Sequence, residues 1–596
     1  MWVLITLWHK MTPRSLYRPN DQMIFSRLFA VGAALVSSYS FAARSPGPVG
    51  DDPPRERYAQ IWYVASDSPT EPRRNGSRTA PWTTIHEAVR AAEGATADQP
   101  HAVFVAAGAY SGQTLHLREN VDLYGGFCPL TWKRNLRRHA TVLDGEGRRR
   151  IVIACDDAVV DGFVFRRGVA RGEGGALLCA GTSPTITNNY FVSNMTRAPE
   201  PWAPTHLHEN AHDGGAIAVL DGAAPLIQGN LFFKNCTEVG RGGAVALDRH
   251  AAGVIADNVF LQNVAGTIDE HRSSDGGAVS VFDWSAPEIR GNLFLENRAL
   301  ARNDGGAIFV CLWSAPQMVA NVFAGNACDD DGGAIFIGGQ EHRYERPPDP
   351  RPLEENYLVV VSRNRFAGNS SPRNNSGGMR VVKEARVRLV NNLFHSSDQV
   401  YMQASDVHLV NNTIIDAVIF REMAGDQWNG VVANNIFRGD LDGEPPTTAT
   451  CCYAQQPLDG EGNFSTAPKL ASDGAKLVAG TQRFDAAQAV TAIEIEPDDV
   501  PDASLVGRIV RAGDRWSVIQ DQHDNSVVVW GDFSDAQELE VVPSYRLNAD
   551  SPCIDRGCPR HAPDVDLHED RRPTGQGVDV GADEYAADPP PRDARP

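Results

Sequence analysis

Apolar and polar positions recur between residues 173 and 435 in two short phrases. The first phrase is a Gly-Gly pair followed by Ala or Ala-like small and apolar residues, and it begins at Gly174, Gly214, Gly242, Gly276, Gly305 and Gly332. The second phrase is Asn-x-Phe-x-x-Asn, and it begins at Asn189, Asn230, Asn258, Asn292, Asn321 and Asn364, with weaker versions at Asn392, Asn412 and Asn435. In four consecutive copies the second glycine precedes the first asparagine by 15 residues. This regular spacing identifies a repeat protein.

The repeated segments are expected to be strands, because they are short, rich in Val, Ile and Phe, and bounded by Gly, Asn and Pro. No Asn-Gly hairpin signal recurs at a fixed place, so each strand should pair with the equivalent strand of the next repeat. The pattern therefore predicts an all-β parallel β-helix whose coils lie about 4.8 Å apart. The asparagines should hydrogen-bond along the stack. A ladder of aromatic rings is expected inside, formed by Phe232, Phe260, Phe294, Phe323 and Phe366.

Other segments flank the repeats. An apolar run from Leu28 to Val36 after Arg27 indicates a signal peptide and hence an exported protein. A short amphipathic helix at Thr83–Ala92 has a capping box and should cover the first coil. We expect a signal peptide (1–42), a linker (43–58), an N-terminal cap with the first coils (59–150), β-helix repeats (151–465), a small antiparallel β insertion (466–547), a closing segment (548–585) and a disordered tail (586–596).

The net charge of -20 argues against nucleic acid or an anionic membrane as a partner. No later stretch approaches 18 consecutive apolar residues, so we expect no membrane span. Ten cysteines in an exported chain permit disulfides. Cys553 and Cys558 form the expected local pair, whereas Cys451 and Cys452 should find separate partners. We expect a monomer.

Function in a solenoid is expected in loops that break the repeat length. Most connections from the closing Asn to the next Gly-Gly take 6 to 8 residues, but Asn194 to Gly214 takes 20 and Asn263 to Gly276 takes 13. These two long loops precede coils two apart, so they should emerge at one corner roughly 10 Å from each other, with Arg241 between them. The tentative catalytic residues are His208, His212, Arg241, Glu270 and His271.

Several chemistries fit these loops. His208-Glu-Asn-Ala-His212 matches the zinc-protease pattern, although Gly214 and Gly215 would end the helix that this pattern needs. Simple ligation of a transition metal would instead use His206, His208, His212 and Asp213 as the ligands. A His or Arg side chain facing carboxylates could also abstract a uronate proton in β-elimination. Finally, the loops could be solvated polar segments without chemistry.

Acidic residues precede the glycine pairs and should recur at one corner of the coils. They could hold Ca²⁺ through oxygen ligands, or each could cap its own turn. A second basic and aromatic group lies between Gly338 and Tyr357. The tentative substrate-binding residues are Asp213, Asp275, Asp304, Asp331, Trp202, Arg343 and Tyr344.

Three stretches resemble known families. The order Trp62-Tyr-Val, Pro81-Trp-Thr-Thr-Ile and Leu123-Tyr-Gly-Gly-Phe resembles bacterial right-handed parallel β-helix proteins of the pectin-lyase-like superfamily. The Gly-Gly-Ala-Ile and Phe-x-x-Asn phrases resemble the repeats of chlamydial polymorphic outer-membrane proteins. The tail, with Asn548-Ala-Asp-Ser-Pro-Cys and Val578-Asp-Val-Gly-Ala-Asp-Glu-Tyr, is similar to the closing segment of choice-of-anchor Q proteins. The pectin-lyase-like superfamily includes lyases, hydrolases, adhesins and proteins without known activity, so the resemblance implies a fold and not a reaction.

The combined pattern predicts an exported, right-handed parallel β-helix protein that engages extended carbohydrate along its long face. Polysaccharide or cell-surface glycan is the expected partner. Two rival hypotheses are a polysaccharide lyase or glycoside hydrolase that acts on acidic polysaccharide, and an adhesin-like surface protein without catalysis.

Overall fold

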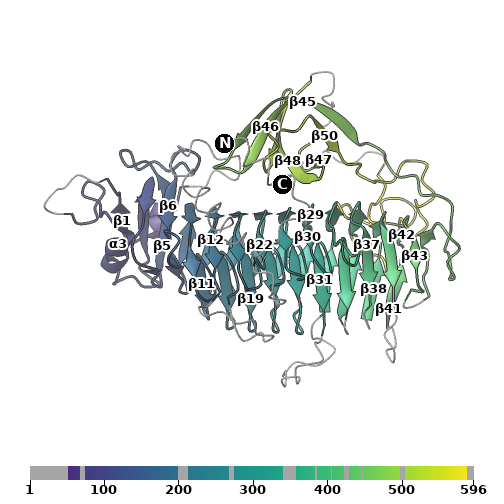
Figure 1. Cartoon of the computed structure of the whole chain (residues 1–596), viewed down its shortest axis with the longest axis horizontal. Helices are drawn as coiled ribbons and strands as arrows, with labels where there is room; N and C mark the ends of the chain where they lie inside the picture. Colours follow the sequence, from purple (N-terminus) through teal and green to yellow (C-terminus); the bar gives the residue numbers. More distant parts are fainter. Residues whose placement is uncertain are drawn as a thin grey trace, which may run out of the picture.

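The computed structural model describes residues 52–67, 74–198, 212–267, 274–339, 358–382, 385–403, 406–421, 429–445, 448–496 and 504–586. These residues form a long stack of parallel β coils with a small barrel on one side (Figure 1). The only α-helix in these ranges is α3 (Ile85–Ala91), and a 3-10 helix, η2, spans Arg55–Arg57. No helix in the same ranges is long and apolar enough to cross a membrane. The predicted all-β parallel β-helix is confirmed.

Four parallel sheets run along the stack. The first sheet contains β1 (Gln60–Val64), β2 (His101–Ala106), β5 (Val121–Phe127), β8 (Val159–Asp161), β12 (Thr185–Thr187), β16 (Leu226–Gln228), β20 (Val254–Ala256), β24 (Glu288–Arg290), β28 (Gln317–Val319), β32 (Leu358–Ser362), β35 (Arg386–Val390), β38 (Asp406–Val410) and β41 (Asn429–Ala433). The second sheet contains β3 (Gly108–Tyr110), β6 (Thr141–Asp144), β9 (Phe163–Arg166), β13 (Tyr190–Val192), β17 (Leu231–Phe233), β21 (Val259–Leu261), β25 (Leu293–Leu295), β29 (Val322–Ala324), β33 (Arg365–Ala367), β36 (Leu393–His395), β39 (Thr413–Ile414), β42 (Ile436–Phe437) and β44 (Tyr453–Ala454).

The third sheet contains β4 (Leu115–His116), β7 (Val152–Ile153), β11 (Leu177–Ala180), β15 (Ile217–Leu220), β19 (Val245–Asp248), β23 (Val279–Val281), β27 (Ile308–Val310), β31 (Ile335–Gly338), β34 (Met379–Val382), β37 (Gln399–Met402), β40 (Ala417–Phe420) and β43 (Leu441–Asp442). A short corner sheet contains β10 (Val169–Ala170), β14 (Met195–Thr196), β18 (Cys236–Thr237), β22 (Val264–Ala265), β26 (Arg298–Ala299) and β30 (Ala327–Cys328). One coil runs from the third sheet through the first, the second and the corner sheet, and the next coil then begins.

The interior is filled by a ladder of phenylalanine rings. Each asparagine phrase places its Phe on an inward position of the second sheet, where it is fully buried. Successive rings lie 4.2–4.9 Å apart, with planes tilted by 4–11°. The five predicted rungs are confirmed, and the ladder also includes Phe165, Phe191 and Phe394.

The asparagines form ladders at the two ends of the second-sheet strands. Asn292 donates from its backbone and from Nδ2 to Oδ1 of Asn321, and its own Oδ1 accepts the matching pair from Asn258. Asn292 Nδ2 also donates to the Ile255 and Arg290 carbonyls. Every donor and acceptor of a buried amide is used in this way, which removes the cost of burying it.

The glycine pairs have two separate causes. Gly276 has φ +75°, a conformation that L side chains rarely adopt. A Cβ on Gly277 would lie 2.1 Å from the Gly306 carbonyl oxygen, so close contact between coils excludes any side chain there. The Asp before the glycine pair does not simply cap its own turn, which was one of the two expectations for these acids. Asp275 Oδ1 instead accepts from the backbone nitrogen of Asp304 in the next coil, at 2.9 Å.

The N-terminal end is closed by α3, as predicted. Thr84 and Glu87 form the expected capping box, and Ile85, Ala88 and Val89 are buried. Part of the stretch that we assigned to a linker is packed against the first sheet. Tyr58 donates its hydroxyl to Asp122 Oδ2 at 2.7 Å.

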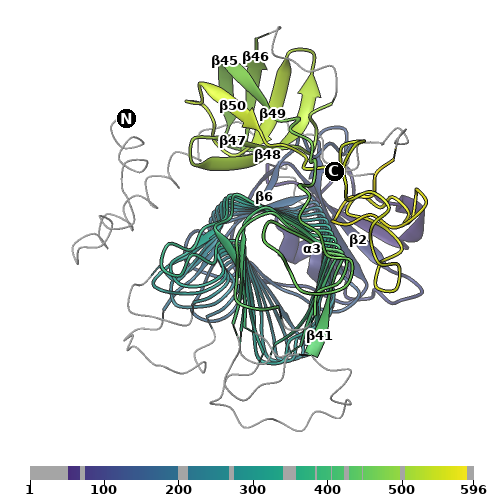
Figure 2. The same ribbon diagram turned by 90° about the vertical axis from the view of Figure 1, so that its right-hand side faces the viewer.

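The small β insertion is a closed barrel of β45 (Ala475–Asp485), β46 (Val490–Ile495), β47 (Ile509–Ala512), β48 (Arg515–His523), β49 (Ser526–Trp530) and β50 (Glu538–Val541). All its strand pairs are antiparallel, in agreement with the sequence prediction. The barrel packs on the outer face of the second sheet, and Figure 2 shows it from the end of the stack. Trp516 lies over Gly325 and Gly368, and a Cβ on Gly368 would lie 1.9 Å from the indole.

The closing segment packs against the last coils through a column of asparagines in the turns. Asn391 donates to the Val565 carbonyl at 2.6 Å, Asn411 to Asp579 at 2.9 Å and Asn434 to Cys558 at 3.0 Å. A fully buried ion pair holds the segment's own fold, with Arg572 Nη1 2.9 Å from Glu584 Oε2.

Candidate functional site

The outer face of the third sheet carries a row of aromatic side chains. Strand alternation directs Ile308 and Ile335 inward, so Phe309 and Phe336 point outward from β27 and β31. Phe282, which follows β23, continues the row. Ring centroids lie 6.4 Å apart for Phe282 and Phe309, and 5.3 Å apart for Phe309 and Phe336. All three rings are only 4–6% exposed.

A network of four carboxylates and two guanidinium groups borders the Phe282 end of this row. Arg241 Nη2 lies 2.5 Å from Asp213 Oδ2 and 3.2 Å from Asp248 Oδ2. Arg249 continues the network outward: its Nη1 is 3.6 Å from Asp248 Oδ2 and 3.1 Å from Glu173 Oε1, and its Nε is 2.6 Å from Asp221 Oδ1. We call these six residues the acid–arginine network.

The network is buried at one end and open at the other. The Arg241 and Asp213 side chains are 5% and 4% exposed, whereas those of Arg249 and Asp221 are 38% and 52% exposed. The buried pairs hold Arg249 and Asp221 at the surface in a fixed arrangement. Polar groups fixed in this way are suited to binding a ligand, because little side-chain freedom is lost when it binds.

The carboxyl groups of the network differ in acidity. Burial raises the pKa of Glu173, against the opposing effect of Arg249. Burial also raises the pKa of Asp248, although Arg241 works in the other direction. The hydrogen bond from Arg249 lowers the pKa of Asp221. Environments that separate the pKa values of neighbouring carboxyl groups are typical of acid–base sites.

Arg241 retains a hydrogen-bond donor that no described side chain uses. Its guanidinium carbon lies 3.7 Å from the centre of the Phe282 ring. Burial opposes its charge, but Asp213 and Asp248 outweigh that effect and raise its pKa. Nη1 is buried without a hydrogen-bond partner among the described residues. Buried polar groups are seldom left in this state, so the vicinity of Nη1 is suited to an additional acceptor.

A second aromatic ladder follows the turns between the third and first sheets. Trp284 stacks on Trp313 with centroids 5.1 Å apart, and His250 lies over Trp284 at 6.5 Å. All three residues have positive φ, between 54° and 62°. His250 is exposed, and it lies next to Arg249 in the chain. The open margin of the site therefore consists of Asp221, Arg249 and His250.

The residues before the glycine pairs form one column along a corner, which we call the pre-glycine column. It contains Glu173, Asp213, Arg241, Asp275, Asp304 and Asp331. The glycine after each of the first five donates a backbone hydrogen bond to the carbonyl of the column residue in the next coil. Burial, followed by the neighbouring carboxylates of Asp275 and Asp331, raises the pKa of Asp304 well above its ordinary value. At the end of the column Arg380 Nη1 lies 3.2 Å from Asp331 Oδ1, and the same guanidinium covers the Tyr401 ring.

Three of the predicted site residues are brought together by the fold. His212, Asp213 and Arg241 meet where the corner sheet joins the third sheet, and the Gly240 position lies against the His212 carbonyl. His212 is 7% exposed, its Nδ1 has no hydrogen-bond partner among the described residues, and burial lowers its pKa. Its backbone is not helical, so the helix that the zinc-protease pattern needs does not include His212.

The described ends of the two long loops lie at one corner of the coils. One joins β14 to β15 and the other joins β22 to β23, and the shorter connection from β18 to β19 carries Arg241 between them. The remaining predicted site residues lie outside the described residues: Trp202, His206, His208, Glu270, His271, Arg343 and Tyr344.

No group of three or more His, Cys, Asp or Glu side chains within the described ranges is placed to hold a metal ion. This applies to the described part of the pre-glycine column, where Asp213, Asp304 and Asp331 hydrogen-bond to backbone nitrogens or to arginines. Asp275 likewise accepts from the chain itself. The Ca²⁺ interpretation of this column stays a prediction.

The sequence analysis missed Glu173, Asp248, Arg249 and the outward aromatic residues. A signal for them exists in the third-sheet strands. Ile308-Phe-Val-Cys and Ile335-Phe-Ile are apolar at positions that point to both faces, whereas a strand with one solvated face would alternate apolar with polar residues. The charged turn Asp248-Arg249-His250 stands out only once the coils are aligned.

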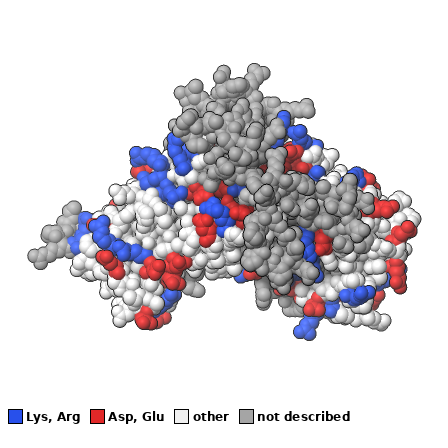
Figure 3. Space-filling view, turned by 90° about the horizontal axis from the view of Figure 1, so that it is seen from below, with Lys and Arg blue, Asp and Glu red and all other residues white. Residues whose placement is uncertain are grey.

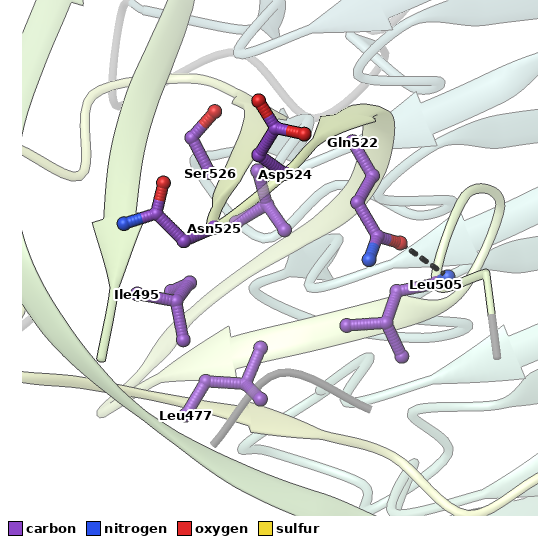
Figure 4. Close-up of a pocket in the computed structure, with 8 residues that line it drawn as sticks. Leu477, Ile495, Leu505, Gln522, Asp524, Asn525 and Ser526 are labelled. Atoms are coloured by element: carbon purple, nitrogen blue, oxygen red, sulfur yellow. Dashed lines mark hydrogen bonds between the residues drawn. The ribbon is translucent and has the colours of Figure 1, made fainter. Parts of the chain in front are cut away.

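Charge on the described surface opposite the barrel is mixed and local. Figure 3 views the side opposite the barrel and shows Lys and Arg intermingled with Asp and Glu in small groups, without a broad field of one sign among the residues it colours. A small depression lies at one end of the barrel, where the Gln522 side chain accepts a hydrogen bond from the Leu505 backbone at 2.7 Å (Figure 4). Its apolar residues, Leu477, Ile495, Leu505 and Val527, belong to the barrel's own core. We place no site there.

No protein-family model matches the chain, and no curated protein matches its sequence. Solved structures with a similar arrangement include pectate lyase Pel9A, with 12% identity, coverage of 88% of this chain and 96% of that one, and a TM-score of 0.33. A mutant tailspike protein of E. coli bacteriophage HK620 has 8% identity, coverage of 87% and 100%, and a TM-score of 0.27. XylC in complex with xylose has 9% identity, coverage of 88% and 99%, and a TM-score of 0.29. Likeness at this level says nothing about the chemistry of this chain.

Proposed function

We propose that the protein is exported and binds an extended glycan along the margin of the third sheet, with Asp221, Arg249 and His250 in contact with the sugar. One observation carries the proposal: partly exposed polar groups are fixed by a buried ion network directly beside two stacked aromatic ladders. Carboxylate and guanidinium groups form strong, directional hydrogen bonds, which sugar hydroxyls can complete. The Phe and Trp rings are nearly fully buried, so they support the network and do not themselves contact the sugar.

The charge of the network favours neutral sugar units. Four carboxylates surround two guanidinium groups, so the network as a whole has an excess of acidic groups even though Arg249 is exposed. A uronate placed beside Asp221 would meet a like charge, which is unfavourable. Sugar hydroxyls can donate to Asp221 and accept from Arg249. The repeating coils extend this margin in one direction, which suits a linear polymer.

The test is binding of the full chain to a panel of soluble polysaccharides, neutral and uronate-containing, followed by titration calorimetry with any that bind. We expect binding to a neutral polymer, weakened at least tenfold by Asp221→Asn or Arg249→Gln. Lys476→Gln on the barrel is the matched control, because its ion pair with Glu538 is also exposed. Equal affinity in Asp221→Asn, Arg249→Gln and Lys476→Gln would overturn the assigned site, and no binding to any polymer would overturn the function.

Glycoside hydrolysis is the second candidate function. The observation that favours it is the contrast between the raised pKa values of Glu173 and Asp248 and the lowered pKa of Asp221 around one shared arginine. A protonated carboxyl group could donate a proton to the leaving oxygen while an ionised one activates water or attacks. Cleavage of a uronate polymer by β-elimination is less well matched to the excess of acidic groups in the network.

Product analysis distinguishes these reactions. Hydrolysis releases reducing ends without ultraviolet absorbance, whereas β-elimination of a uronate polymer creates an absorbing unsaturated product. We expect any hydrolysis to be abolished by Glu173→Gln and Asp221→Asn and retained by Lys476→Gln. Binding without either product would indicate an adhesin-like protein.

A further inference from the structure

Two cysteines from distant parts of the chain meet where the closing segment contacts the last coils. The side chain of Cys451 lies close enough to that of Cys558 for the two thiols to interact. Cys451 follows the short bridge that pairs Ala433 with Thr450, and Cys558 lies in the closing segment. Both are thiols in this structure, and both are partly exposed.

The backbone around the two cysteines is held by one buried asparagine. Asn434 Oδ1 accepts from the Cys558 nitrogen at 2.6 Å, and its Nδ2 donates to the Cys558 carbonyl at 3.0 Å. The Asn434 nitrogen donates to the carbonyl of Thr450, the residue before Cys451, at 3.1 Å. These hydrogen bonds hold the backbones of the two cysteines next to each other, so that their side chains can meet.

We infer that Cys451 and Cys558 form a disulfide that fastens the closing segment to the end of the β-helix. This pairing differs from the local Cys553–Cys558 bridge expected from the sequence. Cys553 is fully buried, and its backbone nitrogen donates a hydrogen bond to the Ser551 hydroxyl. Cys452 is also fully buried. Its sulfur accepts a hydrogen bond from the Asn435 nitrogen and donates one to the Thr450 carbonyl. The expectation that Cys451 and Cys452 pair with separate cysteines stays a prediction.

The reaction is thiol–disulfide exchange with a small disulfide such as oxidised glutathione. The thiolate of one cysteine attacks the reagent and releases one glutathione thiolate, and the second cysteine then displaces the other. One disulfide is reduced to two glutathione thiols while the protein is oxidised by two electrons, and both cysteine protons pass to solvent or to the released thiolates. Burial raises the pKa of Cys451, against the opposing effect of the Arg556 guanidinium, so exchange should accelerate as pH rises.

The bond would close a long loop. The segment between the two cysteines contains the whole barrel, so one covalent link would constrain both the barrel's connections and the closing segment. Cross-links that close long loops restrict the unfolded chain most. The structural role of the bond is therefore to hold the C-terminal end of the stack together.

Peptide mapping of the full chain tests the inference. The reduced protein is incubated with oxidised glutathione, quenched with an alkylating reagent and digested without reduction. We expect one linked peptide pair containing Cys451 and Cys558, absent in Cys558→Ser and in Cys451→Ser but present in Cys553→Ser. A Cys553–Cys558 link, or Cys451 and Cys558 that remain separately alkylated or glutathionylated in the wild-type chain, would overturn it.

A stability measurement provides a second criterion that does not require the variants to be as stable as the wild type. The melting temperature of each protein is compared before and after oxidation. Oxidation should raise the melting temperature of the wild type and of Cys553→Ser, and it should leave that of Cys558→Ser unchanged. An equal rise in Cys558→Ser would show that another cysteine pair is responsible.

Discussion

Two ladders of polar side chains run along the same coils, and they solve the problem of burial differently. In the asparagine ladder each amide both donates and accepts, so every rung satisfies the next. The pre-glycine column consists mostly of carboxylates, which only accept when ionised. Asp275 and Asp304 each accept from a backbone nitrogen of the next coil. A neutral self-complementary ladder can extend indefinitely, whereas an acidic ladder needs cations from elsewhere.

This difference explains where the candidate site lies. The acidic column is interrupted by Arg241, which binds Asp213 and Asp248, and it ends at Asp331 beside Arg380. Side chains from the outer face of the third sheet thus approach the column at these two places. The asparagine ladder needs no such cation along its described rungs, and we assign it no site.

The largest expected effect comes from placing a charge in the neutral ladder. Asn292→Asp replaces an amide that donates to Ile255, Arg290 and Asn321 with a carboxylate that faces the same oxygens. We expect a loss of about 5 kcal/mol, because the charge is buried without a partner and several acceptors lose their donors. The measurement is urea unfolding followed by circular dichroism. Gln317→Glu, the same change at an exposed position of the first sheet, is the control and should change stability by under about 0.5 kcal/mol.

The converse change removes the cation from the acidic column. Arg241→Met should cost about 3 kcal/mol at neutral pH, because Asp213 and Asp248 remain buried without their partner. The deficit should shrink as pH falls, because burial raises the pKa of Asp248 and its carboxyl group then becomes neutral. A deficit that is the same at pH about 4 and pH about 7 would show that Arg241 contributes by packing on Phe282 and not by its charge.

Much of this comparison could be predicted from the sequence, and its limits are physical. The Phe and Asn ladders follow from spacing alone, because each repeat places its equivalent of Phe294 and of Asn292 at the same point of its coil. The barrel strands β47 to β49 were also foreseen from alternation. The acid–arginine network was not, because Glu173, Asp221 and Arg249 come from three different coils and meet only when the coils are in register. The contact between Cys451 and Cys558 was missed because the whole barrel lies between them in the sequence, and sequence spacing does not show which distant residues are close in space.

Within the acidic column, the effect of pH on stability should be largest where the carboxyl groups lie closest together. The folded pKa of Asp304 is raised above its ordinary value of 3.8 by burial and by its acidic neighbours. The carboxyl group of Asp304 therefore holds its proton more tightly in the folded state than in the unfolded state. Its contribution to the free energy of unfolding is fully present below about pH 4 and is lost as pH rises through the folded pKa. Asp304→Asn should therefore be more stable than the wild type at pH about 8 and not at pH about 4. Its amide oxygen can still accept from the Asp331 nitrogen.

Urea unfolding of both proteins across this pH range checks the result. Asp550→Asn on the closing segment is the control, because its exposed carboxylate is paired with Lys469 and its pKa is lowered. If Asp304→Asn showed no gain at high pH, the acidic column would be compensated by groups other than the arginines described above.

The smallest expected effect on stability is also the one that bears most on function. Asp221 belongs to the same ion network as Asp213, but its side chain is 52% exposed and that of Asp213 is 4% exposed. Asp221→Asn should therefore change the free energy of unfolding by less than about 1 kcal/mol, as is usual for exposed ion pairs. Asp213→Asn should cost about 3 kcal/mol, because it leaves Arg241 with one carboxylate fewer in a buried site. If Asp221→Asn nevertheless weakens glycan binding tenfold, the network acts through its open margin. A large loss of stability in Asp221→Asn would instead make the whole network a structural ion cluster, equivalent in role to the asparagine ladder.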